Sequence, residues 1–193
     1  MFNIGIDCLL IYIIRRVVVV KPEIKPEWVE KYTDSFASHL RYYRQAADKL
    51  GVDKSLVLIH DNSKSMDEEF PWYVRRFGGE IKDDPEWLAA WNHHIHNNPH
   101  HWEYWIIPGG NNEPSTILPM PERYVLEMVA DWMGSGRAYT GDWDMTDWLS
   151  RNLSRIKIHN KTRERVEKIL VDKLGYERQD MMLWRWDCRA VKK

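Results

Sequence analysis

Apolar side chains recur at helical spacing over most of the chain that follows Pro26. The apolar positions of the first such segment lie three or four residues apart: Phe36, Leu40, Tyr43, Ala47 and Leu50. Residues at this spacing share one face of an α-helix. Proline is typical of a first helical turn and glycine of the position after a helix, and Pro26 and Gly51 fit these places. The pattern predicts a long amphipathic helix that ends near Leu50.

The same reasoning predicts shorter helices along the rest of the chain. Ser55 is expected to cap a helix whose first residues, 56–59, are apolar on every side and therefore buried. The segment 107–119 is rich in Pro, Gly, Asn and Ser and is expected to be a loop. The other expected elements are a short helix or irregular segment over 68–77 and helices over 84–97, 121–132 (ended by Gly134 to Gly136), 143–158 and 162–174. Strand signals are absent after the N-terminal segment, so the sequence predicts an all-α fold.

Apolar residues also dominate the first twenty positions, in two runs that Arg15 and Arg16 separate. The first run, 4–14, is too short to cross a membrane and lacks the features of a signal peptide. Its β-branched content favours a short extended or β N-terminal arm, and an extension outside the fold is the alternative. We therefore expect an arm over 1–25, a helical domain over 26–175 and a C-terminal tail over 176–193, with no membrane anchor.

Balanced charges limit the partners of the protein. Its 193 residues include 28 Lys and Arg and 29 Asp and Glu, for a formal net charge of −1 at pH 7. A surface that binds a polyanion needs an excess of basic residues, so polymeric nucleic acid is not an expected partner. Two cysteines, Cys8 and Cys188, make no disulfide framework, which agrees with a reducing cytoplasm. A homo-oligomer is compatible with this composition.

The pair His60-Asp61 directly follows the apolar residues 56–59. Two adjacent ionisable groups at the end of a buried helix are costly unless something pairs with them. A divalent cation would do so, with a neutral imidazole and a carboxylate as ligands. The alternative is that Asp61 caps a helix or turns the chain toward Asn62, without any role in metal binding.

His39 and Asp131 add to this pair. His39 follows Phe36 by three residues and shares the apolar face of the first helix, and Asp131 follows Glu127 by four residues. Taken singly, each is explained as well by a hydrogen bond at the edge of the core. Together with the pair they supply four ligands from three helices, as in the metal sites of helical bundles. The predicted metal ligands are His39, His60, Asp61 and Asp131.

A dense histidine segment, WNHHIHNNPHHW, covers residues 91–102. So many imidazoles favour metal or phosphate binding over a solvated turn. His94 and His101 are seven residues apart, and Pro99 prevents one continuous helix, so a bend would have to bring them together. We expect these two histidines to complete a second metal site. The expected substrate contacts in this segment are His93, His100 and Trp102.

In order and approximate spacing, His39, His60-Asp61 and Asp131 resemble the HD-domain metal-dependent phosphohydrolases. Those are helical proteins in which such a set holds one divalent metal, and members with two metals add two histidines where residues 93–101 lie here. The runs HDNSK at 60–64, NPHHW at 98–102 and EMVADW at 127–132 are also similar to a family of small phage and bacterial proteins of uncharacterised function. The resemblance covers about residues 30–172. It implies an HD-domain-like helical bundle with one or two Mn, Fe, Co, Ni or Mg ions, located in a host cytoplasm if the protein is phage-encoded.

Lys64 departs from that resemblance. The nucleotidase-like HD enzymes carry a glutamate three residues after the HD aspartate, where this chain has Lys64. A lysine cannot act as that base, but it can bind a phosphate oxygen. The alternative is a simple ion pair between Lys64 and Glu68. Acid–base catalysis would then fall to Glu68, Glu69 or Glu127.

These features predict a metal-dependent phosphohydrolase that acts on a nucleotide or a small phosphoester through metal-activated water. Lys64, with Arg75 or Arg76, would neutralise charge that develops on the phosphate. Tryptophans beside the histidine segment would stack on a base, unless they serve the core alone. Two other classes stay open: a di-iron oxygenase with an HD-like fold, and a non-catalytic binding protein of phage origin that a metal stabilises.

Overall fold

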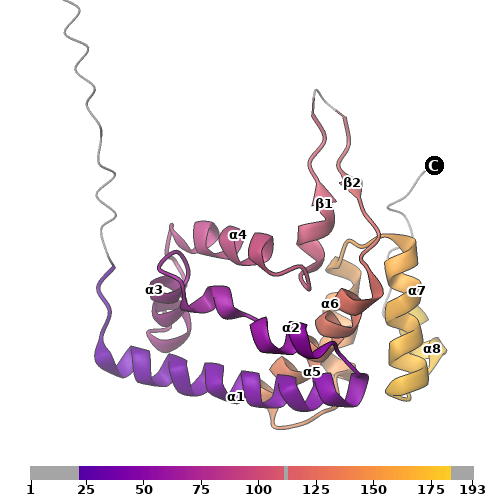
Figure 1. The fold of residues 1–193 in the computed structure, drawn as a ribbon, viewed down its shortest axis with the longest axis horizontal. Coiled ribbons are helices and arrows are strands. Elements are labelled where there is room, and N and C mark those ends of the chain that lie inside the picture. The colour runs from indigo at the N-terminus through magenta and orange to yellow at the C-terminus, as the bar shows by residue number, and fades with distance from the viewer. Residues whose placement is uncertain (1–21, 111–112, 184–193) are drawn as a thin grey trace, which may run out of the picture.

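A computed structural model of the protein describes residues 22–110 and 113–183. Within these residues the chain forms eight α-helices and one two-stranded sheet (Figure 1). The all-α class expected from the sequence is therefore confirmed. Most of the expected N-terminal arm, 1–25, lies outside the described residues, as does much of the expected tail, 176–193.

The helices follow one another along the chain, and the two-stranded sheet lies in the longest connection between them. Their bounds are α1 Pro26–Leu50, α2 Lys54–Ile59, α3 Phe70–Tyr73, α4 Trp87–Asn97, α5 Glu122–Thr140, α6 Thr146–Asn152, α7 Asn160–Lys168 and α8 Arg178–Leu183. Short 3₁₀ or π-helical turns extend or join them at Asn62–Ser65, Val74–Gly78, Trp102–Trp105, Leu153–Arg155 and Ile169–Lys173. Across the described part of the chain, no helix has the length and apolar character needed to cross a membrane.

Helices α1 and α5 form the most extensive helix pair of the fold (Figure 1). Gly134 of α5 permits their close approach, because a Cβ atom at this position would lie 2.6 Å from the Cα and N atoms of Tyr43. The expectation that Gly134 to Gly136 end this helix is wrong. The helix continues to Thr140, and Gly141, with a φ of 76°, follows it. Packing against α1 outweighs the low helix propensity of glycine.

Helix α2 is less buried than its apolar sequence suggests. Leu58 and Ile59 are 78% and 58% exposed, and Leu56 is the one buried residue of this helix. The expectation that residues 56–59 are buried on every side is therefore wrong, because this short surface helix turns a single face to the core. Its N-cap is Asp53 rather than Ser55, and the Asp53 carboxylate accepts a hydrogen bond from the Ser55 backbone N–H at 2.8 Å.

The segment 107–119, expected to be a loop, contributes to a small antiparallel sheet. Strands β1 Ile106–Ile107 and β2 Thr116–Ile117 pair so that Ile106 lies opposite Ile117. β-Branched residues on either side of a connection rich in Pro, Gly and Asn favour such a hairpin. Strands of two residues are too short to produce a period in the sequence. The hairpin projects away from the helices (Figure 1).

Several other helix boundaries also differ from those expected. Helix α4 begins at Trp87, three residues late, and Asp84 pairs with Arg75 Nε at 2.6 Å instead of opening the helix. The helices expected over 143–158 and 162–174 correspond to α6 and α7. Helix α6 is followed by the 3₁₀ turn Leu153–Arg155, and α7 by the π-helical turn Ile169–Lys173. Tyr176, at the start of the expected tail, packs on the core.

Two apolar clusters share helix α1. The larger contains Tyr43 and side chains of α5, α6 and α7, and the smaller contains Tyr32, Tyr73 and Val74. His39 lies between them along α1, in ring contact with Phe36 on one side and Tyr43 on the other. The two apolar clusters are therefore separated by a buried polar region that includes His39.

The contact between α1 and α5 can be tested with a pair of glycine variants. We expect Gly134→Ala to destabilise the protein by about 1–3 kcal/mol, because the new methyl group meets backbone atoms that cannot yield. Gly136→Ala is the matched control in the same helix, since its Cβ would come no closer than 4.0 Å to Met145. The control should gain roughly 0.5–1 kcal/mol from helix propensity. Thermal unfolding followed by circular dichroism measures both, and equal unfolding temperatures would contradict the proposed close contact.

Candidate metal centre

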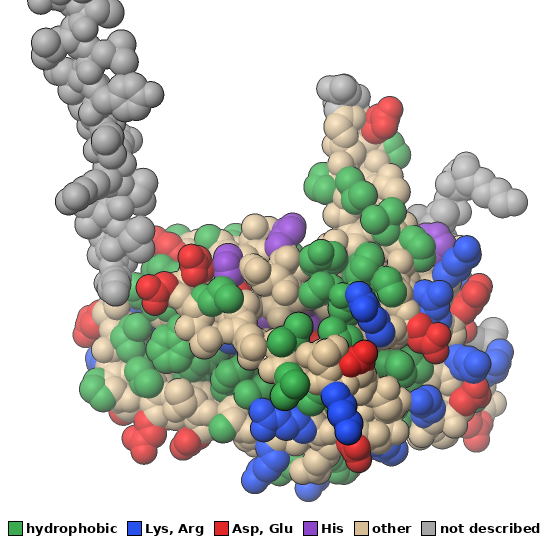
Figure 2. Space-filling model, in the orientation of Figure 1, with side chains coloured by type: hydrophobic (Ala, Val, Ile, Leu, Met, Phe, Trp, Pro, Cys, Tyr) green, Lys and Arg blue, Asp and Glu red, His purple; other side chains and the backbone are tan. Residues whose placement is uncertain are grey.

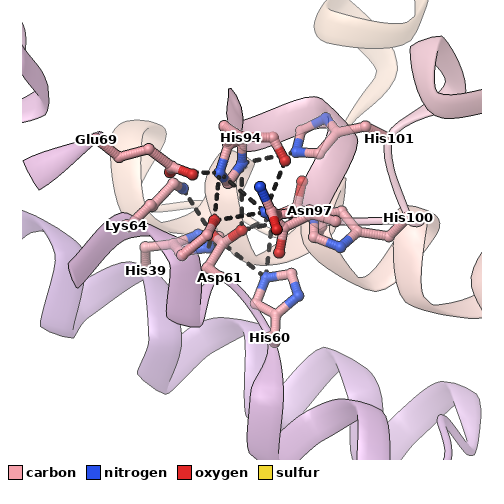
Figure 3. Close-up of polar contacts among 12 residues, drawn as sticks. His39, His60, Asp61, Lys64, Glu69, His94, Asn97, His100 and His101 are labelled. Atoms are coloured by element: carbon pink, nitrogen blue, oxygen red, sulfur yellow. Dashed lines mark hydrogen bonds and ion pairs between the residues drawn. The ribbon is translucent and has the colours of Figure 1, made fainter. Parts of the chain in front are cut away.

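Histidine and carboxylate side chains from four parts of the chain converge between the two apolar clusters (Figure 3). Helix α1 supplies His39, and the turn after α2 supplies His60 and Asp61. Helix α4 and the bend after it supply His94, His100 and His101. Helix α5 supplies Glu127 and Asp131. All four residues predicted for the first metal site, and both predicted for the second, lie in this cluster.

The turn after α2 points both His60 and Asp61 inward. His60 is the C-cap residue directly after α2, and Asp61 takes the left-handed conformation with a φ of 58°. This conformation is unfavourable for a residue with a Cβ atom, although Asp tolerates it better than most. The Asp61 residue is 1% exposed. Backbone strain at a buried polar residue of this kind is typical of functional sites.

The first ligand group consists of His39, His60, Asp61 and Asp131. Both histidine Nε2 atoms lie 3.2–3.6 Å from Asp61 Oδ2 and from Asp131 Oδ1. Four ligands at about 2.1 Å from one cation lie roughly 3.0–3.4 Å from one another. The separations in this group therefore suit a single metal ion after small adjustments.

The second ligand group consists of Asp61, His94, His100 and His101. Asp61 Oδ1 lies 3.4 Å from His94 Nε2 and 3.6 Å from His100 Nε2. The Nε2 atoms of His94 and His101 are 2.8 Å apart, so the bend at Pro99 does bring these two histidines together. His100, expected to contact substrate, belongs to the ligand group instead. Asp61 is common to both groups and presents one carboxylate oxygen to each.

Three of the converging atoms have no hydrogen-bond partner among the described residues. They are His60 Nε2, Asp61 Oδ1 and His100 Nε2, and all three are buried. Buried polar atoms are nearly always paired, and an unpaired one costs about 1–3 kcal/mol. A cation in the first group would satisfy His60 Nε2, and a cation in the second would satisfy Asp61 Oδ1 and His100 Nε2, so the residues present fit one or more metal ions.

The other ring nitrogen of four histidines, Nδ1, faces away from the convergence point and has a polar partner of its own. The partners are Ser135 Oγ for His39 (3.2 Å), Glu127 Oε1 for His60 (3.0 Å) and His100 (3.2 Å), and Glu69 Oε2 for His94 (2.9 Å). Such partners accept the Nδ1–H, which fixes the tautomer that leaves Nε2 free to bind a metal. The arrangement is that of histidines held in place as metal ligands.

Glu69 and Glu127, predicted as acid–base groups, are therefore placed to orient histidines. Glu69 is 0% and Glu127 3% exposed, and each carboxylate contacts two imidazoles. Glu69 also contacts His93, at 2.7 Å from Nδ1, and this draws His93 away from the two ligand groups. His60, His100 and Glu127 form a third group whose ligand atoms also converge closely enough to hold an ion.

Lys64 lies at the edge of the first ligand group. Its Nζ donates a hydrogen bond to Asp61 Oδ2 at 2.6 Å, so its partner is Asp61 and not Glu68. The ammonium also faces the rings of Phe36 and Tyr73, 5.4 Å from each centroid. Burial alone lowers the pKa of Lys64, but the charges of Asp61 and Asp131 raise it by more. The pKa of Lys64 is therefore above its usual value, and the side chain stays protonated.

The buried charges of the centre balance one another. Burial alone raises the pKa of Asp61, but Lys64 and His60 outweigh it and hold this pKa well below its usual range. Burial lowers the pKa of His60, whereas Asp61 and the carboxylates on α5 raise it, to about 9. Burial, with His100 and His94 close by, holds the pKa of His101 well below 6.5. His101 is therefore neutral and available as a ligand.

A cavity of about 350 Å³ opens onto the ligand groups. Its lining includes His100, His101 and Asp131 together with Trp91, Trp102 and Trp148. The predicted role of Trp102 beside a substrate is compatible with this place. Arg76 is not part of the cavity lining. Its guanidinium lies 4.4 Å from the Trp87 ring centroid and donates to the Lys82 carbonyl at 3.2 Å.

No sequence pattern pointed to the roles of Ser135, Ser63 and Asn98 in the site. Asn98 Nδ2 donates to Ser63 Oγ at 2.7 Å and to the His94 carbonyl at 2.8 Å, which fixes the bend that carries the second group of histidines. The one available signal was the Asn98-Pro99 pair at the end of α4, which marks a break but not its geometry.

The shared ligand Asp61 makes a direct prediction about metal binding. We expect Asp61→Ala to abolish the metal held by the first and second ligand groups, because both groups lose a ligand. The double variant His94→Ala/His101→Ala should leave the first ligand group intact and so retain part of the metal. His96→Ala is the control, since His96 is exposed and its Nδ1 contacts the Asn92 carbonyl. Circular dichroism first establishes that each variant keeps its helical content. The number of metal ions per protein is then measured by inductively coupled plasma mass spectrometry. Full metal in Asp61→Ala would contradict the assignment.

A substitution at Glu127 should weaken metal binding without abolishing it. Its Oε1 atom faces the Nδ1 atoms of both His60 and His100, so Glu127→Gln removes the negative charge that orients two ligands. Loss of such an outer partner typically costs 10–100-fold in metal affinity, and we expect a decrease of about this size. Glu122→Gln, at an exposed position of the same helix, should change nothing. Competition with a chelating indicator dye measures the affinity, and equal affinities for the two variants would exclude the orienting role.

Comparison with known protein families adds one finding. No curated protein and no solved structure matches the chain. A family model described as a family of unknown function (DUF5662) matches residues 29–172, which include every residue of the ligand groups. The chain therefore belongs to the DUF5662 family.

Proposed function

We propose that the protein is a metal-dependent phosphohydrolase that acts on a nucleotide or a small phosphoester. The observation that carries the proposal is the place of Asp61, whose two carboxylate oxygens face two different ligand groups. A shared carboxylate between two sets of ligands is suited to a pair of divalent ions, such as Mn, Fe, Co, Ni or Mg, and the first group alone suits one. When bound, such ions lower the pKa of water and polarise a phosphoryl oxygen.

Residues of the cavity would hold the organic part of the substrate. Trp132 and Trp148 lie with their ring centroids 5.1 Å apart and both line the cavity, together with Trp91 and Trp102. Flat aromatic surfaces of this kind suit a nucleobase or another planar ring. Arg155 also lines the cavity and adds a positive charge for a phosphate that extends from the metal centre.

Lys64 would hold the phosphoryl group on the other side. An ammonium has three N–H donors, and the structure gives one of them to Asp61. The remaining donors are available to an oxyanion beside the first ligand group. Fixed positive charge at the position where negative charge develops in the transition state contributes to the rate.

The mixture of acidic and basic side chains on the surface favours a small substrate over a polymer. On the face shown in Figure 2, acidic side chains predominate on the left and lie among the basic ones on the right, so no continuous basic surface forms. This distribution agrees with the near-zero net charge of −1. A nucleotide needs only the local charges of Lys64 and Arg155, whereas a nucleic acid needs a long basic surface.

A lysine variant tests the proposed chemistry. We expect Lys64→Ala to keep its metal and to lose phosphate-ester turnover by on the order of 10²-fold, because charge stabilisation is removed from the transition state. Lys64→Arg should restore turnover in part, since its planar fork does not match a compact ammonium. Lys54→Ala, at an exposed position of α2, is the control. Turnover of nucleoside monophosphates and p-nitrophenyl phosphate with Mn²⁺, Co²⁺ or Fe²⁺ is measured after metal content is verified.

Other outcomes of the same experiment point to the two alternative classes. A wild-type protein that contains iron when purified without oxygen, shows the absorption of a di-iron centre and hydrolyses no ester would favour an oxygenase. A protein that binds a nucleotide and releases it unchanged would favour a non-catalytic binding protein with a structural metal. Near wild-type turnover by Lys64→Ala would contradict the role of Lys64 in holding phosphate.

A further inference from the structure

A second and smaller cavity lies between α1, α5 and the turn that carries Lys64. Its volume is about 70 Å³. Residues of its lining include His39 and Lys64 next to the first ligand group, and Tyr32, Tyr73 and Ser135 around them. Ser135 also lines the larger cavity, so the two cavities approach each other at this residue.

Two buried tyrosine hydroxyls in this lining have no partner. Tyr32 is 4% and Tyr73 3% exposed, and neither hydroxyl has a hydrogen-bond partner among the described residues. Their ring centroids are 6.1 Å apart. Burial raises the pKa of both phenols far above the usual value, and the charges of Asp61 and Glu69 raise it further. Both hydroxyls therefore remain protonated and can donate a hydrogen bond.

The lining of the small cavity is rich in hydrogen-bond donors and free of carboxylates. Its described residues carry three phenol and two serine hydroxyls, one ammonium and one imidazole, and none carries a carboxyl group. The larger cavity differs, since Glu103 and Asp131 belong to its lining. A site made of donors, with a lysine that retains unused N–H groups, is suited to an anion.

The size of the cavity limits what it can hold. Its volume of about 70 Å³ is one fifth of that of the larger cavity, about 350 Å³. The small cavity therefore suits a group of a few atoms, such as one tetrahedral oxyanion, and the larger cavity suits the organic part of a substrate. Unpaired buried hydroxyls are a cost that such an anion would remove.

We propose that this cavity is an oxyanion subsite, in which Tyr32 and Tyr73 donate hydrogen bonds and Lys64 supplies the charge for a phosphoryl group or for the phosphate product. The choice of phosphate among oxyanions rests on the proposed function. The place of the subsite rests on the cavity and its unpaired hydroxyls. The phosphoryl group would then lie beside Lys64 and His39, and the rest of the substrate would extend past Ser135 into the larger cavity.

Two isosteric variants, with inorganic phosphate as the probe, test this subsite. Tyr32→Phe and Tyr73→Phe remove one unpaired hydroxyl each and preserve the ring, so without phosphate their unfolding temperatures should equal or exceed that of the wild type. Calorimetry of the full chain with saturating Mn²⁺ should give a phosphate affinity that falls by about tenfold for each hydroxyl removed. Tyr43→Phe is the matched control, because its hydroxyl is also buried and unpaired but lies outside the small cavity.

The possible results separate this inference from the proposed function. Equal phosphate affinity in the wild type and the double variant Tyr32→Phe/Tyr73→Phe would overturn the subsite, and so would the absence of phosphate binding by the wild type. An equal loss in Tyr43→Phe would overturn it too, since the effect would then be general. A loss confined to the two cavity variants supports the subsite even if the wild type hydrolyses no ester, and in that case the proposed hydrolysis alone fails.

Discussion

Asp61 carries a negative charge in a position where water hardly reaches it, and most of the centre is arranged around that charge. One oxygen faces His39, His60 and Lys64, and the other faces His94 and His100. An ionised carboxylate in such a place is strongly destabilising unless cations and donors surround it. The protonated Lys64 and His60 provide this compensation in the protein alone, and one or two divalent ions would provide more of it.

The two apolar clusters define where such a polar region can lie. Helix α1 contributes side chains to both clusters, and His39 lies on α1 between them. Its approach to α5 through Gly134 brings Asp131 within 3.4 Å of His39. A larger residue at position 134 would separate the two helices and with them two ligands of the first group. Packing and ligand geometry are therefore coupled at this helix pair.

An ordered shell of polar partners keeps the imidazoles in one orientation. Glu127 links His60 with His100 across the two ligand groups, and Glu69 links His94 with His93. Carboxylates held this deeply are more useful as fixed acceptors than as groups that exchange protons with a substrate. Tyr32, Tyr73 and Lys64 line a small cavity beside the first group, and there the two tyrosine hydroxyls have no partner among the described residues, whereas Lys64 bonds to Asp61.

The sequence by itself determined the helical class, the course of α1 and the residue types of the first ligand group. Helical spacing placed His39 on the inner face, and the pair His60-Asp61 was visible as an ionisable dipeptide after an apolar turn. What spacing could not determine was the role of each histidine in α4 and in the bend after it. His93 and His100 were equivalent in the sequence, yet the first pairs with Glu69 and the second joins the ligand group.

The tertiary structure decided that difference, because the direction of a side chain after a helix break depends on the turn. Asn98 has an extended conformation and is bonded to Ser63, which lies 35 residues earlier in the chain. This contact directs His100 and His101 inward. Likewise, Gly134 resembles a helix stop in the sequence, and only its contact with Tyr43 shows why α5 continues through it. Local periodicity determines which face a residue takes on one helix, whereas contacts between distant segments determine which faces meet.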